Sequence, residues 1–237
     1  MCGIVGFVSV KKLNTSALVE GALMQRERGF KDGVGLIYWK DKWNVKKTLK
    51  PLDKQLIKLF KHETTIGVLH HRLASAGSIN LDNVHPVKHD NIYVVHNGHS
   101  YLGELEVMKY QLHNASDTKG VAMLLNKNGV ELILDIGDGA YVIMKEDEKA
   151  LYIVRDGYPL YLWISKDFRT LLFASTEKAI ITTAAALKLK PYEYKSFASL
   201  RESALFKVTM DKKIAIKLID EIKPKASYGI MKKNKVW

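Results

Sequence analysis

The chain has 237 residues, of which 47% are hydrophobic, with 37 lysines and arginines against 25 aspartates and glutamates. This length and apolar content suffice for a sizeable core, so we expect residues 1–237 to form a single domain. One cysteine excludes an internal disulfide, and no apolar run approaches the length of a membrane span. Because no secretory signal opens the chain, the sequence predicts a cytoplasmic protein without a membrane partner.

The net charge of +12 raises the question of a nucleic-acid partner. The lysines are scattered along the chain, and no basic stripe alternates with aromatic residues. We therefore expect no nucleic-acid binding and interpret the lysines as a solvated surface. Docking onto an acidic partner protein is the alternative.

Hydrophobic periodicity in the first third of the chain predicts alternating strands and helices. The apolar run at residues 3–10 indicates a strand buried on both faces, and an apolar stripe at helical spacing follows it. The predicted strands are residues 3–10, 34–39, 43–49 and 65–72, and the predicted helices are residues 15–28 and 53–62.

The rest of the chain is mostly β after residue 139. The predicted helices are residues 117–127, 130–136 and 176–187, and the predicted strands are residues 92–96, 140–145, 151–155, 160–165, 171–174, 205–210 and 213–218. Many antiparallel hairpins with few helices predict an α+β layered fold.

The cysteine is the second residue, in the opening Met1-Cys2-Gly3-Ile4-Val5-Gly6. Removal of Met1 would place the thiol on the first residue, beside a free α-amino group. With a pKa near ~8, that amino group could take the thiol's proton. The alternative is a buried cysteine that acts as a small hydrophobe at the start of a strand.

Four further segments carry polar residues that suit a catalytic site. They are Arg28-Gly29 with Asp32 and Gly35; His71-Arg72-Leu73-Ala74-Ser75-Ala76-Gly77; His96-Asn97-Gly98; and Ser116-Asp117-Thr118. Each has an ordinary alternative when taken alone. An Asn-Gly pair commonly forms a hairpin turn, and Ser-Asp-Thr commonly begins a helix.

Taken together and in this order, the five segments resemble the class II glutamine amidotransferases, whose glutaminase domain is an N-terminal-nucleophile hydrolase. The resemblance covers nearly the whole chain, with loose matches such as Ala174-Ser175 after about residue 156. It implies a four-layer αββα sandwich, in which two antiparallel sheets lie face to face between helical layers. It also implies hydrolysis of the glutamine side-chain amide to glutamate and ammonia through a γ-glutamyl thioester.

The resemblance assigns the chemical step to three residues. Cys2 is the nucleophile, and its α-amino group carries the proton. The side-chain amide of Asn97 and the backbone N–H of Gly98 form the oxyanion hole.

Four more residues are assigned to substrate binding. Arg72 binds the α-carboxylate of glutamine through its planar guanidinium, and Asp117 binds the α-ammonium. Leu73 and Ser75 lie where family members contact the substrate. For Asp117, a helix cap is the alternative role.

Two other segments match the family loosely. Arg28 and Asp32 are interpreted as scaffolding for the N-terminus, with a helix end and a loop as the alternative. His85-Pro86 is predicted to form a loop over the pocket.

The sequence contains no glycine-rich phosphate loop and no Cys or His cluster with metal-ligand spacing, so we expect no cofactor and no metal. Family members usually carry an appended synthase domain that consumes the ammonia. We therefore expect the acceptor site on a separate synthase subunit. Two alternatives stay open: an N-terminal-nucleophile amidase for another γ-glutamyl or amide substrate, and a catalytically silent regulatory module.

Overall fold

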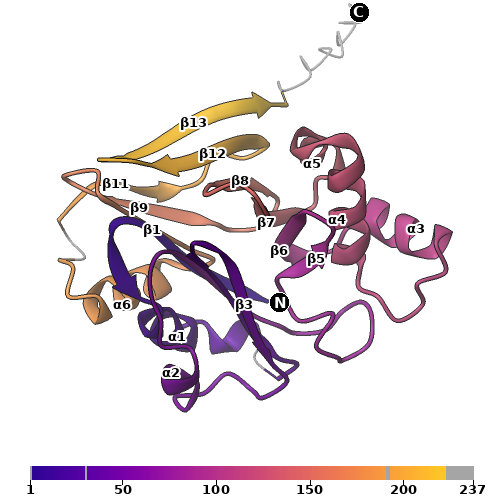
Figure 1. Ribbon diagram of the computed structural model, residues 1–237, viewed down its shortest axis with the longest axis horizontal. Coiled ribbons are helices and arrows are strands. Elements are labelled where there is room, and N and C mark those ends of the chain that lie inside the picture. Colours follow the sequence, from indigo (N-terminus) through magenta and orange to yellow (C-terminus); the bar gives the residue numbers. More distant parts are fainter. Residues whose placement is uncertain (1, 30, 191–192, 223–237) are drawn as a thin grey trace, which may run out of the picture.

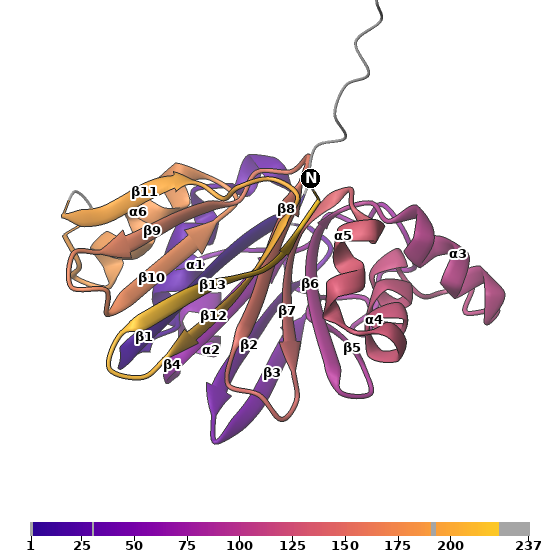
Figure 2. The ribbon, with the colours of Figure 1, turned by 90° about the horizontal axis from the view of Figure 1, so that it is seen from above.

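Two antiparallel β-sheets lie face to face between helices in the computed structural model of this chain (Figures 1 and 2). The structure describes residues 2–29, 31–190 and 193–222. The α+β class and the four-layer αββα sandwich that the resemblance implied are confirmed.

The first sheet has seven strands, with β1 at its centre, in the order β11-β9-β10-β1-β4-β2-β3. Its strands are β1 (Gly3–Asn14), β2 (Val34–Lys40), β3 (Lys42–Thr48), β4 (Glu63–His71), β9 (Tyr161–Ser165), β10 (Thr170–Ala174) and β11 (Tyr194–Ser199). β1 runs antiparallel to β4, and Gly3 lies opposite His71. The start of β1 and the end of β4 therefore lie side by side at the same end of the sheet.

The second sheet has six strands in the order β13-β12-β8-β7-β6-β5. They are β5 (Val87–His89), β6 (Ile92–Gly98), β7 (Gly139–Lys145), β8 (Leu151–Asp156), β12 (Ala204–Met210) and β13 (Ile214–Glu221). The end of β6 pairs with the start of β7, where Gly98 lies opposite Gly139.

The side chains of β1 alternate between two cores. Ile4 and Val8 pack into the core between the sheets. Val5 and Phe7 pack on the other face, against the helices. Since both faces are buried, the strand reads as a continuous apolar run, as the sequence predicted.

Helices cover the outer face of each sheet (Figure 2). α1 (Ser16–Leu23), α2 (Leu56–Leu59) and α6 (Glu177–Ala186) lie on the first sheet. α4 (Asp117–Asn128) and α5 (Ile133–Ile136) pack on the second sheet, and α3 (Tyr101–Lys109) packs on α4. Two short 3-10 turns, η1 (Arg26–Arg28) and η2 (Val130–Leu132), complete the helical elements of the described residues.

The helix predicted at residues 15–28 is shorter than expected and ends at Leu23. After it, the Gln25 side chain turns inward and donates to the carbonyl oxygen of Ile4 at 3.1 Å. This tertiary hydrogen bond replaces the continuation of the helix. The helix predicted at residues 53–62 is likewise limited to the single turn of α2.

Three elements were not predicted: α3, β5 and β11. α3 lacks the usual amphipathic pattern because four of its large apolar side chains are exposed: Tyr101, Leu102, Leu105 and Met108. β5 has only three residues, which is too short for a periodicity.

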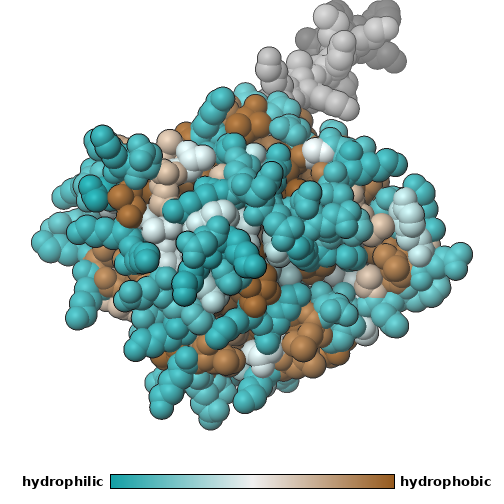
Figure 3. All heavy atoms as spheres, in the orientation of Figure 1, coloured by the Kyte–Doolittle hydropathy of each residue, from teal (hydrophilic) through white to brown (hydrophobic). Residues whose placement is uncertain are grey.

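The molecular surface is mainly hydrophilic on the face shown in Figure 3, with scattered small apolar areas. None of the helices in the described part of the chain combines the length and apolar character that crossing a membrane requires.

Candidate active site

Three chain segments that are distant in sequence meet where β1 begins and β4 and β6 end. Cys2 directly precedes β1, and Arg72 and Leu73 directly follow β4. Asn97 and Gly98 are the last two residues of β6. β1 of the first sheet contacts β6 of the second. The pairing of the strands thus brings the motif residues to one end of the sandwich.

The Cys2 thiol contacts the backbone of Leu73. The Sγ–H donates to the Leu73 carbonyl oxygen, and the Leu73 N–H donates to Sγ, both at 3.3 Å. Burial raises the pKa of the Cys2 thiol, and the N–H of Leu73 opposes that rise. A nearby base is therefore needed to form the thiolate near neutral pH.

Cys2 lines an outer cavity of about 200 Å³. The cavity is lined by Cys2, Leu73, Ala74, Ser75, Asn97, Gly98, His99 and Tyr158. Five of these eight residues were predicted for the site, and Ala74 belongs to the same motif as Leu73 and Ser75. His99 and Tyr158 were not: His99 had only its position after Asn97-Gly98 as a signal, and Tyr158 lies between β8 and β9 with no signal in the sequence.

A smaller inner cavity of about 20 Å³ adjoins the outer one. Cys2, Leu73, Ser75 and Gly98 line both cavities. The inner cavity adds the two charged residues, Arg72 and Asp117. All seven residues predicted for the site therefore surround these two adjoining cavities.

Asn97 is held in place from both ends of its amide. Its Nδ2 donates to Ser175 Oγ at 2.8 Å, and its Oδ1 lies 3.2 Å from His70 Nε2. Ser175 Oγ also accepts the N–H of Ile4 in β1 at 3.0 Å. Asn97 is thus tied to both sheets, with one N–H of its Nδ2 group left for a ligand.

Gly98 requires the absence of a side chain. Its φ is 150°, and a Cβ there would lie 2.3 Å from the carbonyl oxygen of Asp138. Asn97 and Gly98 pair with Ala140 and Gly139 as part of β6, so the alternative of a tight Asn-Gly hairpin turn is wrong.

The Arg72 side chain is 3% exposed, and it holds the loop that follows it. Its Nη2 donates to the carbonyl oxygen of Ala76 at 2.8 Å, and its Nη1 donates to that of Ser78 at 3.1 Å. Since a guanidinium has five N–H groups, donors remain for a carboxylate.

Asp117 is the first residue of α4, and its carboxylate accepts backbone N–H groups from two helix starts. Oδ2 accepts from Ser100 at 2.7 Å, and Oδ1 accepts from Thr118 at 2.9 Å. His99 Nδ1 lies 3.6 Å from Oδ2. Asp117 therefore has a structural role of its own, in addition to the position that it occupies on the inner cavity.

The scaffolding role predicted for Arg28 is confirmed, because its Nε donates to the carbonyl oxygen of Cys2 at 3.0 Å. Asp32 acts elsewhere: its Oδ2 accepts the N–H of Ala74 at 2.8 Å, in the loop after β4. His85-Pro86 forms a loop before β5, as predicted, and His85, which is 5% exposed, lines the inner cavity. That the loop lies over the pocket stays a prediction.

A stack of buried aromatic rings adjoins the site, and two of its members, His85 and His96, line the inner cavity. The ring centroids of His70 and His85 are 4.1 Å apart, those of His85 and His96 are 6.4 Å apart, and those of His96 and Tyr141 are 4.3 Å apart. Burial lowers the pKa of all three histidines, to about 4 for His96. The rings are therefore neutral near pH 7. Sequence reasoning missed this stack because its members come from separate segments.

The buried histidines predict a pH-dependent stability. Their folded-state pKa values lie below the unfolded value of about 6.5, so below that pH the unfolded chain binds more protons. We expect the free energy of unfolding to fall from pH ~6.5 towards pH ~4, by up to ~1.4 kcal/mol per pH unit for each histidine. Denaturant unfolding at several pH values measures it, with His85→Gln as the variant that should flatten the profile. A profile that is flat in the wild type would contradict neutral burial.

Within the described part of the chain, no group of three His, Cys, Asp or Glu side chains is arranged to hold a metal ion.

Comparison with known proteins relates the sequence to one domain family. Residues 82–182 match the family model described as a glutamine amidotransferase domain. Relatives named glutamine–fructose-6-phosphate aminotransferase (isomerizing) include those of Francisella tularensis subsp. tularensis and Buchnera aphidicola subsp. Baizongia pistaciae. They are 30% and 32% identical to this chain, over 70% of it and 31% of each relative. The chain spans about a third of the length of these relatives.

Solved structures share the fold at lower identity. The allosteric regulatory enzyme of purine biosynthesis aligns with a TM-score of 0.68 at 18% identity, over 92% of this chain and 49% of that protein. The glutamine phosphoribosylpyrophosphate amidotransferase of B. subtilis aligns with a TM-score of 0.64 at 18% identity, over 93% and 50%. These similarities concern the fold.

Proposed function

Because residues 82–182 match a glutamine amidotransferase domain and the chain resembles the class II glutamine amidotransferases, we propose that it hydrolyses the side-chain amide of glutamine to glutamate and ammonia. One observation carries the proposal: Cys2, Asn97 and Gly98 surround a cavity that adjoins a second one lined by Arg72 and Asp117. A nucleophile, oxyanion donors and two opposite charges are the groups that hydrolysis of a free amino acid amide requires.

The proposed reaction begins at the Cys2 thiol. Met1 lies outside the described residues, and we propose that it is removed, which frees the α-amino group of Cys2. The amine takes the proton from Sγ, and the thiolate attacks the amide carbon of glutamine. The C–N bond breaks as the protonated α-amino group of Cys2 returns the proton to the leaving nitrogen, which departs as ammonia. Water then hydrolyses the γ-glutamyl thioester to glutamate and regenerates the thiol.

Asn97 and Gly98 are proposed to stabilise the oxyanion of each tetrahedral intermediate. Asn97 Nδ2 retains one N–H after its bond to Ser175. Gly98 lines the cavity beside Cys2, where its backbone can approach a substrate closely. Strand pairing fixes the backbone of Gly98, and contacts with Ser175 and His70 fix the amide of Asn97, before substrate arrives. This is the preorganisation that such a site needs.

Arg72 and Asp117 are proposed to bind the α-carboxylate and the α-ammonium of glutamine. The inner cavity of about 20 Å³ has room for about one water. Binding of the amino-acid head therefore requires the loop at residues 73–78 to move. Since that loop is held by the Arg72 guanidinium, we propose that the substrate carboxylate replaces one of its two carbonyl acceptors.

Charge-removing variants at these two residues should impair recognition of glutamine. Truncating one partner of a desolvated charge pair typically costs ~2–5 kcal/mol, so we expect kcat/KM of Arg72→Ala and Asp117→Ala to fall accordingly, mainly through KM. Steady-state kinetics measure the effect, with two substrates: glutamine, and a γ-glutamyl amide that lacks the α-amino group. The wild type should strongly prefer glutamine, and Asp117→Ala should lose much of that preference.

Asp117→Asn is the matched control for the structural role of the carboxylate. The amide keeps an oxygen that can accept the N–H of Ser100, but it lacks the charge. We expect this variant to fold as the wild type does and still lose the preference for glutamine. If it discriminates as well as the wild type, Asp117 only joins two helices and the ammonium site lies elsewhere. That outcome would favour an amidase for another γ-glutamyl substrate.

The ammonia is proposed to pass to a synthase subunit on a separate chain. The relatives named above are aminotransferases by name. The exposed apolar side chains of α3, close to the His99 side of the cavity, would suit a protein contact. The test is a co-purifying synthase whose ammonia-dependent activity becomes glutamine-dependent when this chain is added.

We also propose a reducing compartment, the cytoplasm, because the mechanism needs a free thiol.

A further inference from the structure

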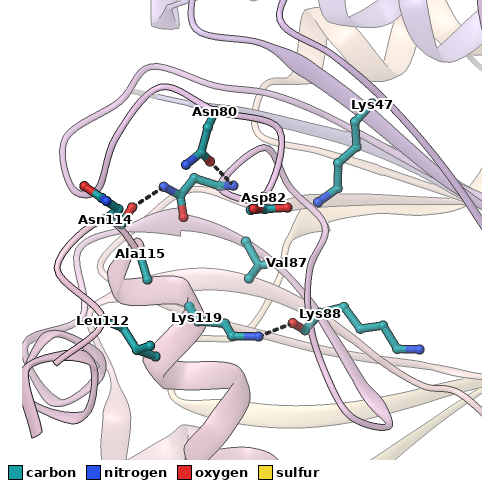
Figure 4. Close-up of a pocket in the computed structure, with 10 residues that line it drawn as sticks. Lys47, Asn80, Asp82, Val87, Lys88, Leu112, Asn114, Ala115 and Lys119 are labelled. Carbon is teal, nitrogen blue, oxygen red and sulfur yellow. Dashed lines mark hydrogen bonds between the residues drawn. The ribbon is translucent and has the colours of Figure 1, made fainter. Parts of the chain in front are cut away.

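A separate cavity of about 320 Å³ lies behind the loop that Arg72 holds (Figure 4). It shares no lining residue with the two cavities around Cys2. We call it the lysine pocket, and it is lined by Lys47, Asn80, Asp82, Asn83, Val87, Lys88, Leu112, Asn114, Ala115 and Lys119. Nothing in the proposed reaction uses it.

Two ammonium groups reach the lysine pocket from different layers of the fold. Lys47, on β3, donates from Nζ to the carbonyl oxygen of Leu81 at 3.1 Å. Lys119, on α4, donates from Nζ to the carbonyl oxygen of Lys88 at 2.7 Å. Each ammonium has three N–H groups, so each keeps donors beyond this bond. Within the described ranges, neither Nζ lies within 4 Å of a carboxylate oxygen.

The two ammonium groups are partly desolvated. The pKa of Lys47 is lowered to about 8, mainly by burial and in part by the positive charge of Lys119, while Asp82 opposes both effects. Burial likewise lowers the pKa of Lys119. Two cations that share one cavity with a single carboxylate leave an excess of positive charge, which a bound anion would relieve.

Lys88 also lines the pocket, but its ammonium group does not point into the cavity. Its side chain points away from the other labelled residues in Figure 4, and its Nζ pairs with Glu146 Oε1 at 2.7 Å. Lys88 is therefore a matched control for lysine charge in this region.

The rest of the lining supplies amides. Asn80, Asn83 and Asn114 line the cavity. Asn83 Nδ2 donates to the carbonyl oxygens of Ser78 and Asn114, so the side chains of Asn80 and Asn114 are the amides that can bind a ligand. The volume exceeds that of an inorganic oxyanion. Its shape and polarity therefore suit a small molecule with a charged end and an uncharged polar end.

We propose that the lysine pocket binds a small organic phosphate. A phosphate monoester carries nearly two negative charges near pH 7 and three acceptor oxygens, so it can engage both ammonium groups at once. Lys47 and Lys119 bind the phosphate, and the amides of Asn80 and Asn114 bind the hydroxyl or carbonyl groups of the organic part.

The wall between this pocket and the proposed glutamine site is one hydrogen-bonded unit. Asn83 Nδ2 donates to the carbonyl oxygen of Ser78 at 2.9 Å, and the same oxygen accepts from Arg72. Asn83 Oδ1 accepts the N–H of Ser116 at 2.9 Å, next to Asp117. An occupant that shifts Asn83 would therefore displace the neighbours of both charged residues. We expect occupancy to change KM for glutamine, and this consequence rests on the proposed function.

Isothermal titration calorimetry of the full chain tests binding without reference to catalysis. The probes are glycerol 3-phosphate, inorganic phosphate and glycerol. We expect saturable binding of glycerol 3-phosphate at millimolar concentration or below, weaker binding of inorganic phosphate, and none of glycerol. A charge-assisted hydrogen bond contributes enough that Lys47→Gln and Lys119→Gln should each weaken binding roughly 10- to 100-fold. Lys88→Gln should bind as the wild type does.

Three outcomes would overturn the proposal: no saturable binding of glycerol 3-phosphate, equal affinity for inorganic phosphate, or equal weakening by Lys88→Gln, which would indicate diffuse surface charge. Glutaminase kinetics with and without glycerol 3-phosphate then test the coupling, which Lys47→Gln should abolish. Binding without an effect on KM would refute the coupling but not the site, and an inactive wild type that binds the probe would refute the proposed function alone.

Discussion

The Cys2→Ala variant is expected to release no ammonia from glutamine above background. Cys2 is the one cysteine of the chain, and its Sγ lines the outer cavity beside Asn97 and Gly98. Without the thiol, no thioester can form. Triad-type sites lose on the order of a million-fold in kcat when the nucleophile is removed. Coupled measurement of glutamate and ammonia detects the loss.

The fold should survive this substitution. The thiol's hydrogen bonds go to the backbone of Leu73 alone, and Cys2 is only partly buried. We expect denaturant unfolding of Cys2→Ala to match the wild type within ~1 kcal/mol. Cys2→Ser is the closer control, since it keeps the shape and a weaker nucleophile. Substantial glutamine hydrolysis by Cys2→Ala would identify another nucleophile and end the present assignment.

The Asn97→Ala variant is expected to have the second largest effect, a fall in kcat of ~100–1000-fold with a smaller change in KM. Removal of one oxyanion-hole donor typically has this cost, because the contact strengthens as charge develops on the oxygen. Steady-state kinetics on glutamine separate the two constants. A rise in KM at constant kcat would instead place Asn97 among the binding residues.

Ser175→Ala is the control for the position of Asn97. It removes the acceptor of Asn97 Nδ2 but keeps the amide itself. We expect a smaller loss of kcat than in Asn97→Ala, and no further loss when the two substitutions are combined. Additive effects would show that Ser175 acts on stability through Ile4 rather than on Asn97.

Local patterns predicted the strands well because strand periodicity follows from burial. The run at residues 3–10 is apolar since β1 packs on both faces, and this feature is readable without a structure. Patterns failed where tertiary contacts decide the conformation. α1 ends at Leu23 because Gln25 bonds to β1, and α3 was missed because its apolar side chains face outward.

The site could be assembled from the sequence only through the resemblance to a family. Cys2, Arg72 and Asn97 lie at the ends of three different strands, and no spacing or periodicity places them together. Even so, the sequence could not show that Arg72 holds the loop through Ala76 and Ser78. It also could not show that Asn97 is fixed by Ser175.

The lysine pocket was not predictable for the same reason. The sequence analysis interpreted the lysines as a solvated surface, since charge scattered along a chain carries no signal of convergence. Lys47 and Lys119 are brought together only by the packing of the loop at residues 78–83 between β3 and α4. Their shared burial is a property of the fold.

The most direct test of the account is mass spectrometry of the native protein after reaction with a glutamine-like alkylating analogue. We predict one adduct per chain, on Cys2, in a species that lacks Met1, with loss of glutaminase activity in step with labelling. Glutamine should protect the thiol, and Asp117→Asn should slow the labelling. Full activity in a chain that retains Met1, or inactivation with the adduct on any residue other than Cys2, would contradict the proposed N-terminal nucleophile.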